Sequence, residues 1–176
     1  MTWYVVDVEA TGPCPGMYSM FELAIVKVSN QINQYLHLRM SPVDGTSYIE
    51  SALEATGNKI EIIKQYESPE EQMKLLKGFL GVSKEGVTPV VWSDNIAFDW
   101  QFLNYYCHAF LGENPFGYSG RRIGDFYAGL TKDPRSSSKW KKFRKTKHTH
   151  NALDDAIGNA EALIEICNQF KIELPK

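Results

Sequence analysis

No part of the 176-residue sequence is apolar over enough consecutive positions to cross a lipid bilayer. The first ten residues, MTWYVVDVEA, also lack the basic start and small-residue cleavage site of a secretory signal. Three cysteines are present, Cys14, Cys107 and Cys167, and their spacing matches neither a disulfide framework nor a metal-binding Cys-x-x-Cys pair. We therefore predict a cytoplasmic protein with free structural thiols and no membrane partner.

A large net charge is also lacking, since 19 basic and 21 acidic residues give a net charge of −2 at pH 7. This balance argues against a general coat for nucleic acid. The charge is nevertheless uneven, because residues 121–147 contain ten Lys and Arg against two Asp. This stretch, called the basic segment below, is either a solvated surface or a contact for a polyanion.

Hydrophobic patterning predicts one α/β domain over residues 1–176. Strand patterns occupy four short stretches, residues 2–9, 20–28, 34–40 and 88–93. Helical periodicity marks three more, residues 69–80, 97–110 and 152–170. A capping box, Ser68-Pro69-Glu70-Glu71, opens the first of these helices. Residues 132–147 are poor in apolar side chains and predict a loop or an exposed helix.

Asp7 and Glu9 lie two residues apart on the first predicted strand, so both carboxylates project from the same face. Two unit charges about 4 Å apart repel by roughly 4 kcal/mol at a surface-like dielectric. A protein seldom keeps such a pair at the end of a buried strand unless a cation neutralises it. The pair is therefore a candidate metal site, with a solvated strand end as the other interpretation.

Two more acids follow predicted strands or begin predicted helices. Asp99 lies just after the fourth strand, and Asp155 lies at the start of the last helix, close behind His150. In an α/β sheet such positions meet at one edge, and carboxylates are ligands that Mg²⁺ and Mn²⁺ prefer. We predict that Asp7, Glu9, Asp99 and Asp155 hold two of these ions for phosphodiester hydrolysis. His150 is the predicted base that accepts the proton of the attacking water.

Three motifs resemble those of the DnaQ-like, DEDDh exonuclease superfamily, which includes polymerase proofreading subunits, ribonuclease T and oligoribonuclease. They are DVEATG at residues 7–12, NIAFD at residues 95–99 and HNALDD at residues 150–155, in the order of the family. The resemblance covers nearly the whole chain. It implies an RNase H-like fold with a mixed five-stranded sheet flanked by helices. It also implies that single nucleotides are released from a 3′ end.

Substrate contacts follow from the same resemblance and from the basic segment. A pocket for the terminal nucleotide is expected at Thr11, Gly12, Tyr18, Asn95 and Phe98. The basic segment is expected to contact phosphates through Lys139, Lys141, Lys142, Arg144 and Lys145. Trp140 and Phe143 are candidates for stacking on a base. The expected partner is nucleic acid with a free 3′ end, in single-stranded form, and a homodimer is one option for the oligomeric state.

The sequence departs from the family at Asp94, where a His is common, and between Asp125 and His150, where basic residues stand in place of an apolar helix that is often found there. These departures concern the substrate more than the acids. We favour DNA as the substrate, with an exoribonuclease (oligoribonuclease-like or RNA-trimming) as the alternative. A second alternative is a nucleic-acid-binding or proofreading subunit that acts through a partner.

Overall fold

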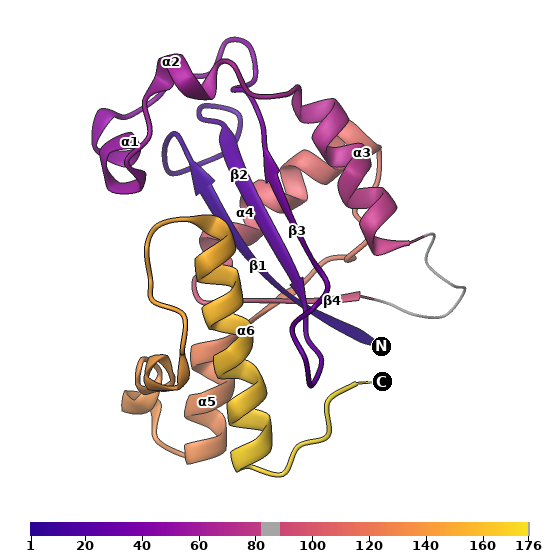
Figure 1. Cartoon of the computed structure of the whole chain (residues 1–176), viewed down its shortest axis with the longest axis vertical. Coiled ribbons are helices and arrows are strands. Elements are labelled where there is room, and N and C mark those ends of the chain that lie inside the picture. Colours follow the sequence, from indigo (N-terminus) through magenta and orange to yellow (C-terminus); the bar gives the residue numbers. More distant parts are fainter. Residues whose placement is uncertain (82–88, 176) are drawn as a thin grey trace.

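A mixed five-stranded sheet forms the centre of this computed structural model, which describes residues 1–81 and 89–175 (Figure 1). Its strands are β1 (Thr2–Ala10), β2 (Met20–Lys27), β3 (Tyr35–Arg39), β4 (Pro89–Ser93) and β5 (Gly120–Arg122). The strand order is β3-β2-β1-β4-β5. The β1–β2 and β2–β3 pairs are antiparallel, whereas the β1–β4 and β4–β5 pairs are parallel. The predicted mixed sheet is confirmed, and the predicted strand residue Thr88 lies outside the described residues.

The helices are α1 (Glu50–Thr56), α2 (Ile60–Ile63), α3 (Pro69–Leu80), α4 (Ile96–Tyr106), α5 (Ile123–Thr131) and α6 (Ala152–Gln169). The three predicted long helices are α3, α4 and α6. The Ser68 hydroxyl oxygen accepts a hydrogen bond from the Glu71 N–H at 3.3 Å, as the capping box predicts. Helix α4 ends earlier than predicted, because the chain widens into a π-helical turn, η1 (Cys107–Leu111).

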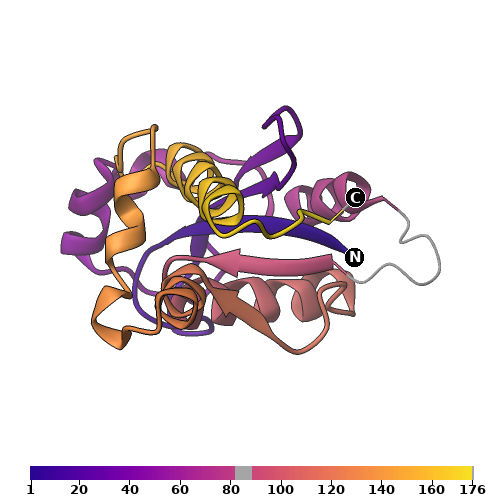
Figure 2. The same cartoon turned by 90° about the horizontal axis from the view of Figure 1, so that it is seen from below.

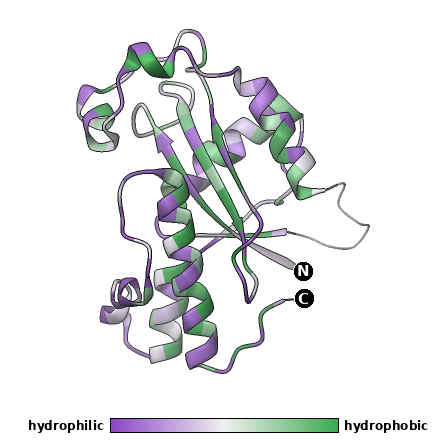
Figure 3. Cartoon of the chain, in the orientation of Figure 1, coloured by the Kyte–Doolittle hydropathy of each residue, from purple (hydrophilic) through white to green (hydrophobic). Residues whose placement is uncertain are grey.

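Alternating side chains of β1 divide the core into two layers. Tyr4, Val6 and Val8 pack with α3 and α4 on one face, whereas Trp3 and Val5 pack with α5 and α6 on the other. Figure 2 shows α6 lying against the sheet close to β1. In Figure 3 the central strands are mostly apolar and the outer segments are mostly hydrophilic, so the sheet is buried between its helices.

The pairing of β1 changes along its length. Among the described residues, only Thr2–Val5 of this strand pair with β4, whereas the ladder with β2 continues to Ala10. The two parallel strands therefore separate after Val5, and this leaves room beside the second half of β1 for a side chain of α4.

The basic segment contains two short 3-10 helices, η2 (Pro134–Ser136) and η3 (Lys139–Phe143), which lead toward α6. Trp140 is fully buried in the layer with α5 and α6, so the prediction that it stacks on a base is wrong. An added Cβ on Gly124 would meet the Trp140 indole nitrogen at 3.3 Å, which shows how closely the indole fits there. Phe143 is half-buried and packs on Tyr127, with ring centroids 5.8 Å apart.

Candidate active site

Three of the predicted acids converge where β1 ends and α6 begins. Asp7 and Glu9 project from the same face of β1, and α6 crosses that face with Asp155 in its first turn. Each of the three carboxyl groups offers an oxygen, and these oxygens all lie within 4.8 Å of one another. The first and third motifs, which lie at opposite ends of the chain, therefore form one cluster.

Asp99 lies beside this cluster, at the point where β1 and β4 separate. Its Oδ1 accepts the Val8 N–H at 3.0 Å, and its Oδ2 accepts the Ser93 hydroxyl. The residue is 4% exposed, and its carboxylate is thereby fixed next to the backbone of Asp7. Burial raises the pKa of Asp99 to about 7, although both hydrogen bonds stabilise its ionised form.

The carboxyl groups of β1 are also poorly ionised without a cation. Burial raises the pKa of Asp7 well above its ordinary value, and repulsion from Asp99, Glu9 and Asp155 raises it further. Burial, with repulsion from Asp155 and then Glu22 and Asp99, raises the pKa of Glu9 to about 8. This excess of clustered oxygen ligands and negative charge fits divalent metal ions of the hard class.

Asp155 has polar partners on both of its carboxylate oxygens. Its Oδ1 accepts from Arg144 Nη2 at 2.7 Å and from the Thr149 N–H at 3.2 Å. Its Oδ2 lies 2.7 Å from His148 Nδ1 and accepts the His150 N–H at 3.1 Å. These contacts on both oxygens hold the carboxylate of Asp155 in one orientation.

Arg144 is separated from the other charges of the basic segment. Its side chain is 8% exposed and points inward to Asp155. Gly158 of α6 makes the space, since a Cβ there would lie 2.6 Å from Arg144 Nε and 2.8 Å from the Thr146 carbonyl oxygen. The sequence alone did not indicate this buried ion pair, because it depends on how the chain returns to α6.

His150 precedes α6 in a left-handed backbone conformation with φ of 56°. Its N–H binds Asp155, whereas the residue is exposed and its ring lies edge-to-face on His148, with centroids 4.3 Å apart. Asn151 caps the helix by accepting the N–H groups of Leu153 and Asp154. The predicted base thus stands at the solvent side of the acids.

Glu22 of β2 is a further acid near the cluster. It pairs across the ladder with Glu9, is 2% exposed, and accepts the Ala152 N–H of α6 at 3.4 Å. Burial opposes its ionisation, but the hydrogen bond and charge of His37, with Arg39, hold the pKa of Glu22 below its ordinary value. The antiparallel pairing of the first two predicted strands is the signal that could have located it.

The candidate nucleotide-binding residues occupy different environments. Thr11 is fully buried, and its hydroxyl donates to the Ser47 carbonyl and accepts from Ser19 N–H, both at 2.9 Å. Gly12 allows the half-buried Tyr18 ring to lie on the backbone, since a Cβ would be 2.3 Å from that ring. The other two candidates retain solvent access, Asn95 as an exposed residue and Phe98 as a half-buried one.

The lysines of the basic segment remain at the surface. Lys141 Nζ lies 2.7 Å from Asp94 Oδ2, so the acid that replaces the family's His is paired with the basic segment. Lys139 Nζ is 3.7 Å from Asp133. Lys142 and Lys145 are both exposed at the surface of the same segment.

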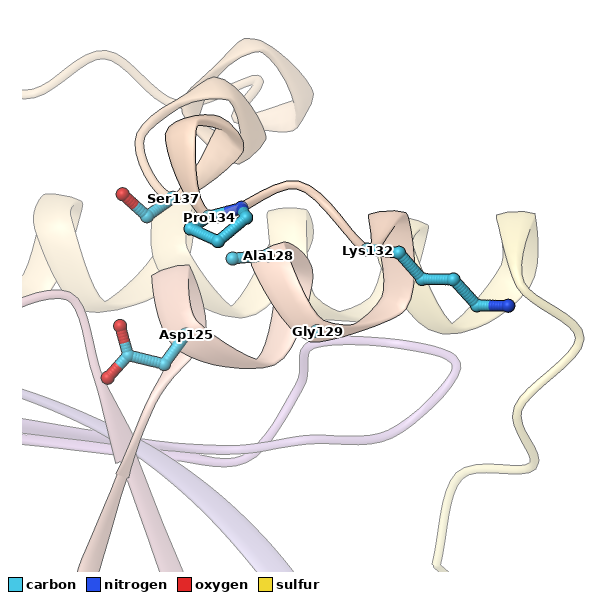
Figure 4. A pocket seen from close by; sticks show the side chains of 6 residues that line it. All are labelled: Asp125, Ala128, Gly129, Lys132, Pro134 and Ser137. Carbon is cyan, nitrogen blue, oxygen red and sulfur yellow. The ribbon is translucent and has the colours of Figure 1, made fainter.

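A separate pocket lies between α5 and η2, and none of the predicted metal ligands lines it (Figure 4). Its lining residues are Asp125, Ala128, Gly129, Lys132, Pro134 and Ser137. Its one carboxylate, Asp125, is already paired with Arg122 at 3.1 Å, and Figure 4 shows Lys132 pointing away from it.

Comparison with known proteins gives consistent matches. The Exonuclease family, of the RNase T type, matches residues 4–163. A 3′-5′ DNA exonuclease of Escherichia coli, Cap18, is 36% identical over 166 residues, which cover 89% of this chain and 86% of that protein.

Solved structures share the fold. The nuclease domain of 3′hExo, a DEDDh family member bound to rAMP, has a TM-score of 0.77 at 19% identity, covering 99% of this chain and 94% of that one. A zinc-bound complex of E. coli ExoI with single-stranded DNA has a TM-score of 0.73 at 14% identity, covering 96% of this chain and 40% of that one. Within the described residues, no helix has the length and apolar character needed to span a membrane.

Proposed function

We propose that this protein shortens single-stranded DNA from the 3′ end with Mg²⁺ or Mn²⁺. The chain belongs to the Exonuclease family and is a 3′→5′ exonuclease of the DEDDh group. The observation that carries the proposal is the convergence of Asp7, Glu9 and Asp155 within 4.8 Å, with Asp99 beside them. DNA as the substrate is supported by the 36% identity to a DNA exonuclease.

The site residues divide into metal ligands and a base. Asp7, Glu9, Asp99 and Asp155 bind two divalent ions, which when present supply an activated water and stabilise the leaving oxygen. His150 accepts the proton of the attacking water, because its ring stands at the solvent side of the acids and a neutral imidazole nitrogen can accept a proton. The hydrogen bonds that Asp155 accepts hold that ligand in place during the reaction.

End-labelled oligonucleotides test the substrate and the polarity. Single-stranded DNA should be shortened from its 3′ end in Mn²⁺ or Mg²⁺, a 3′-phosphorylated strand should be cut poorly, and a circular strand should be resistant. RNA of the same sequence should be cut more slowly. Faster cleavage of RNA would favour the exoribonuclease, whereas cleavage of circles or full activity in excess chelator would refute the proposal.

The basic segment supports binding of a single strand. Lys142 and Lys145 lie at the surface of the segment that leads to His150, and removing one phosphate contact should reduce the slope of log K against log salt by about 0.7. Replacing both by Ala should raise KM and flatten its salt dependence, with kcat little changed. Replacing Lys74 and Lys77 on α3 removes the same charge elsewhere and is the control. Equal salt slopes for the two double variants would show that the basic segment is only a solvated surface.

We also propose one exonuclease domain over residues 1–176 and a cytoplasmic location. Both layers of the core pack on the same sheet. Asp155 of α6, near the end of the chain, joins Asp7 and Glu9, near the start of the chain, in the acid cluster. Cys14, Cys107 and Cys167 are free thiols, as is usual in a reducing compartment.

A further inference from the structure

Two histidines and a carboxylate meet on the outer side of the acid cluster. His148, His150 and Asp155 each offer a ligand atom, and these atoms all lie within 4.8 Å of one another. His148 Nδ1 already lies 2.7 Å from Asp155 Oδ2, and the two imidazole rings are in edge-to-face contact at 4.3 Å. These three residues are called the His148 cluster below.

The backbone explains why the cluster forms. The N–H groups of Thr149 and His150 both bind Asp155, so the chain curves around this carboxylate just before α6. The positive φ of His150 turns the chain into the helix at that point. Both histidines are therefore kept near Asp155, while the 56% exposure of the His148 side chain leaves space beside its ring for a small adjustment.

We propose that the His148 cluster is an inhibitory Zn²⁺ site. Zinc binds His nitrogen and carboxylate oxygen at about 2.0–2.2 Å, and two His with one carboxylate are a known open zinc set that leaves a fourth position for water. Tetrahedral geometry at that bond length separates the ligand atoms by about 3.3 Å. To bind zinc, the 2.7 Å distance between His148 Nδ1 and Asp155 Oδ2 must increase slightly, and the longer distances between ligand atoms, up to 4.8 Å, must decrease. Small rotations of the two exposed imidazole rings can make both changes.

The ligand types separate this site from the acid cluster. Imidazole suits Zn²⁺, whereas Mg²⁺ and Mn²⁺ prefer carboxylate and water oxygens, as Asp7 and Glu9 provide. The inhibitory effect rests on the proposed function. Zinc at the His148 cluster takes the ring of His150, so that ring is not available to accept a proton, and it shares Asp155 with the acid cluster.

Zinc titration of the metal-free protein tests the site. Calorimetry with zinc chloride should show that His148→Asn binds Zn²⁺ at least about tenfold more weakly than the wild type, since loss of even an outer-shell partner costs 10–100-fold. Manganese affinity and Mn²⁺-supported cleavage should fall less than zinc affinity, because His148 contacts only one of the acids, Asp155, which keeps its hydrogen bonds to Arg144, Thr149 and His150. The control is His108→Asn, which removes an exposed histidine of η1 and should leave zinc binding intact.

Inhibition provides the second measurement. The zinc concentration that halves Mn²⁺-supported cleavage should rise by the same factor in His148→Asn and not in His108→Asn. Equal zinc affinity of His148→Asn and the wild type would overturn the proposal and assign zinc to the acid cluster. A protein that degrades no nucleic acid would refute the proposed function, yet its zinc titration would still decide whether the site exists.

Discussion

Replacing Gly158 by Ala tests whether the buried ion pair between Arg144 and Asp155 depends on an absent side chain. The new methyl carbon would lie 2.6 Å from Arg144 Nε, 2.9 Å from Arg144 Nη2 and 2.8 Å from the Thr146 carbonyl oxygen. The first two atoms belong to a side chain that can withdraw, but the third belongs to the backbone. The substitution must therefore move either Arg144 away from Asp155 or the loop before α6.

Two opposing effects set the magnitude. Ala in a helix interior is favoured over Gly by about 1 kcal/mol, whereas overpacking a filled site costs about 1–3 kcal/mol. All three contacts are shorter than 3.0 Å and one is to the backbone, so the cost lies in the upper part of that range, about 2–3 kcal/mol. We expect a net loss of roughly 1–2 kcal/mol, which for a chain of this size lowers Tm by about 2–8 °C. Gly78→Ala on α3 and Gly129→Ala on α5 are matched controls, because no described atom outside their own helix lies within 4 Å of the added Cβ. Both should raise Tm by a few degrees.

Thermal unfolding of the three variants, measured in chelator and again in Mn²⁺, separates the effects. Gly158→Ala should be less stable than the wild type in chelator, and its affinity for Mn²⁺ should change because Arg144 no longer fixes Asp155. If Gly158→Ala were more stable than the wild type, like the two controls, the buried position of Arg144 would not require a glycine at residue 158.

Three further predictions concern the acids and the base. Asp7→Asn should abolish cleavage while the protein stays folded, and it should remove the rise of Tm in Mn²⁺ that we expect for the wild type. An active Asp7→Asn variant would contradict the metal site. His150→Ala should lower kcat by roughly 10²–10⁴-fold and leave Mn²⁺ affinity intact in calorimetry, whereas near wild-type kcat would show a residue that only precedes the helix. Because the pKa of Glu9 is about 8 in the fold against an ordinary 4.5, the fold binds more protons than the unfolded chain between those values. Metal-free stability should therefore fall as pH rises from about 4.5 to 8, by up to roughly 5 kcal/mol, and saturating Mn²⁺ should reduce the fall; a metal-free Tm that rises over this range would contradict it.

Periodic elements were predictable from the sequence because burial imposes a repeat on the residues themselves. The alternation along β1 placed Asp7 and Glu9 on one face, and the stripe of α6 placed Asp155 at its start. The resemblance added the mixed five-stranded sheet. Together they predicted the fold and the positions of the acids.

Contacts that depend on chain reversals were not predictable in this way. Arg144 was grouped with surface charges, but the turn before α6 carries it inward to Asp155. Trp140 stands among lysines in the sequence, yet η3 turns its indole into the layer with α5 and α6 while its neighbours Lys139 and Lys141 stay exposed. Spacing along the chain says nothing about either turn.

The burial of Trp140 also has a consequence for the proposed binding of nucleic acid by the basic segment. Its indole packs in the core layer with α5 and α6, so the backbone that carries the neighbouring lysines of η3 is held in place. Fixing the backbone of one residue costs about 1–2 kcal/mol of conformational entropy, and here that cost is met when the protein folds. If the segment binds nucleic acid as proposed, only the lysine side chains and not their backbone would have to be ordered on binding, so less of the free energy of each phosphate contact would be lost.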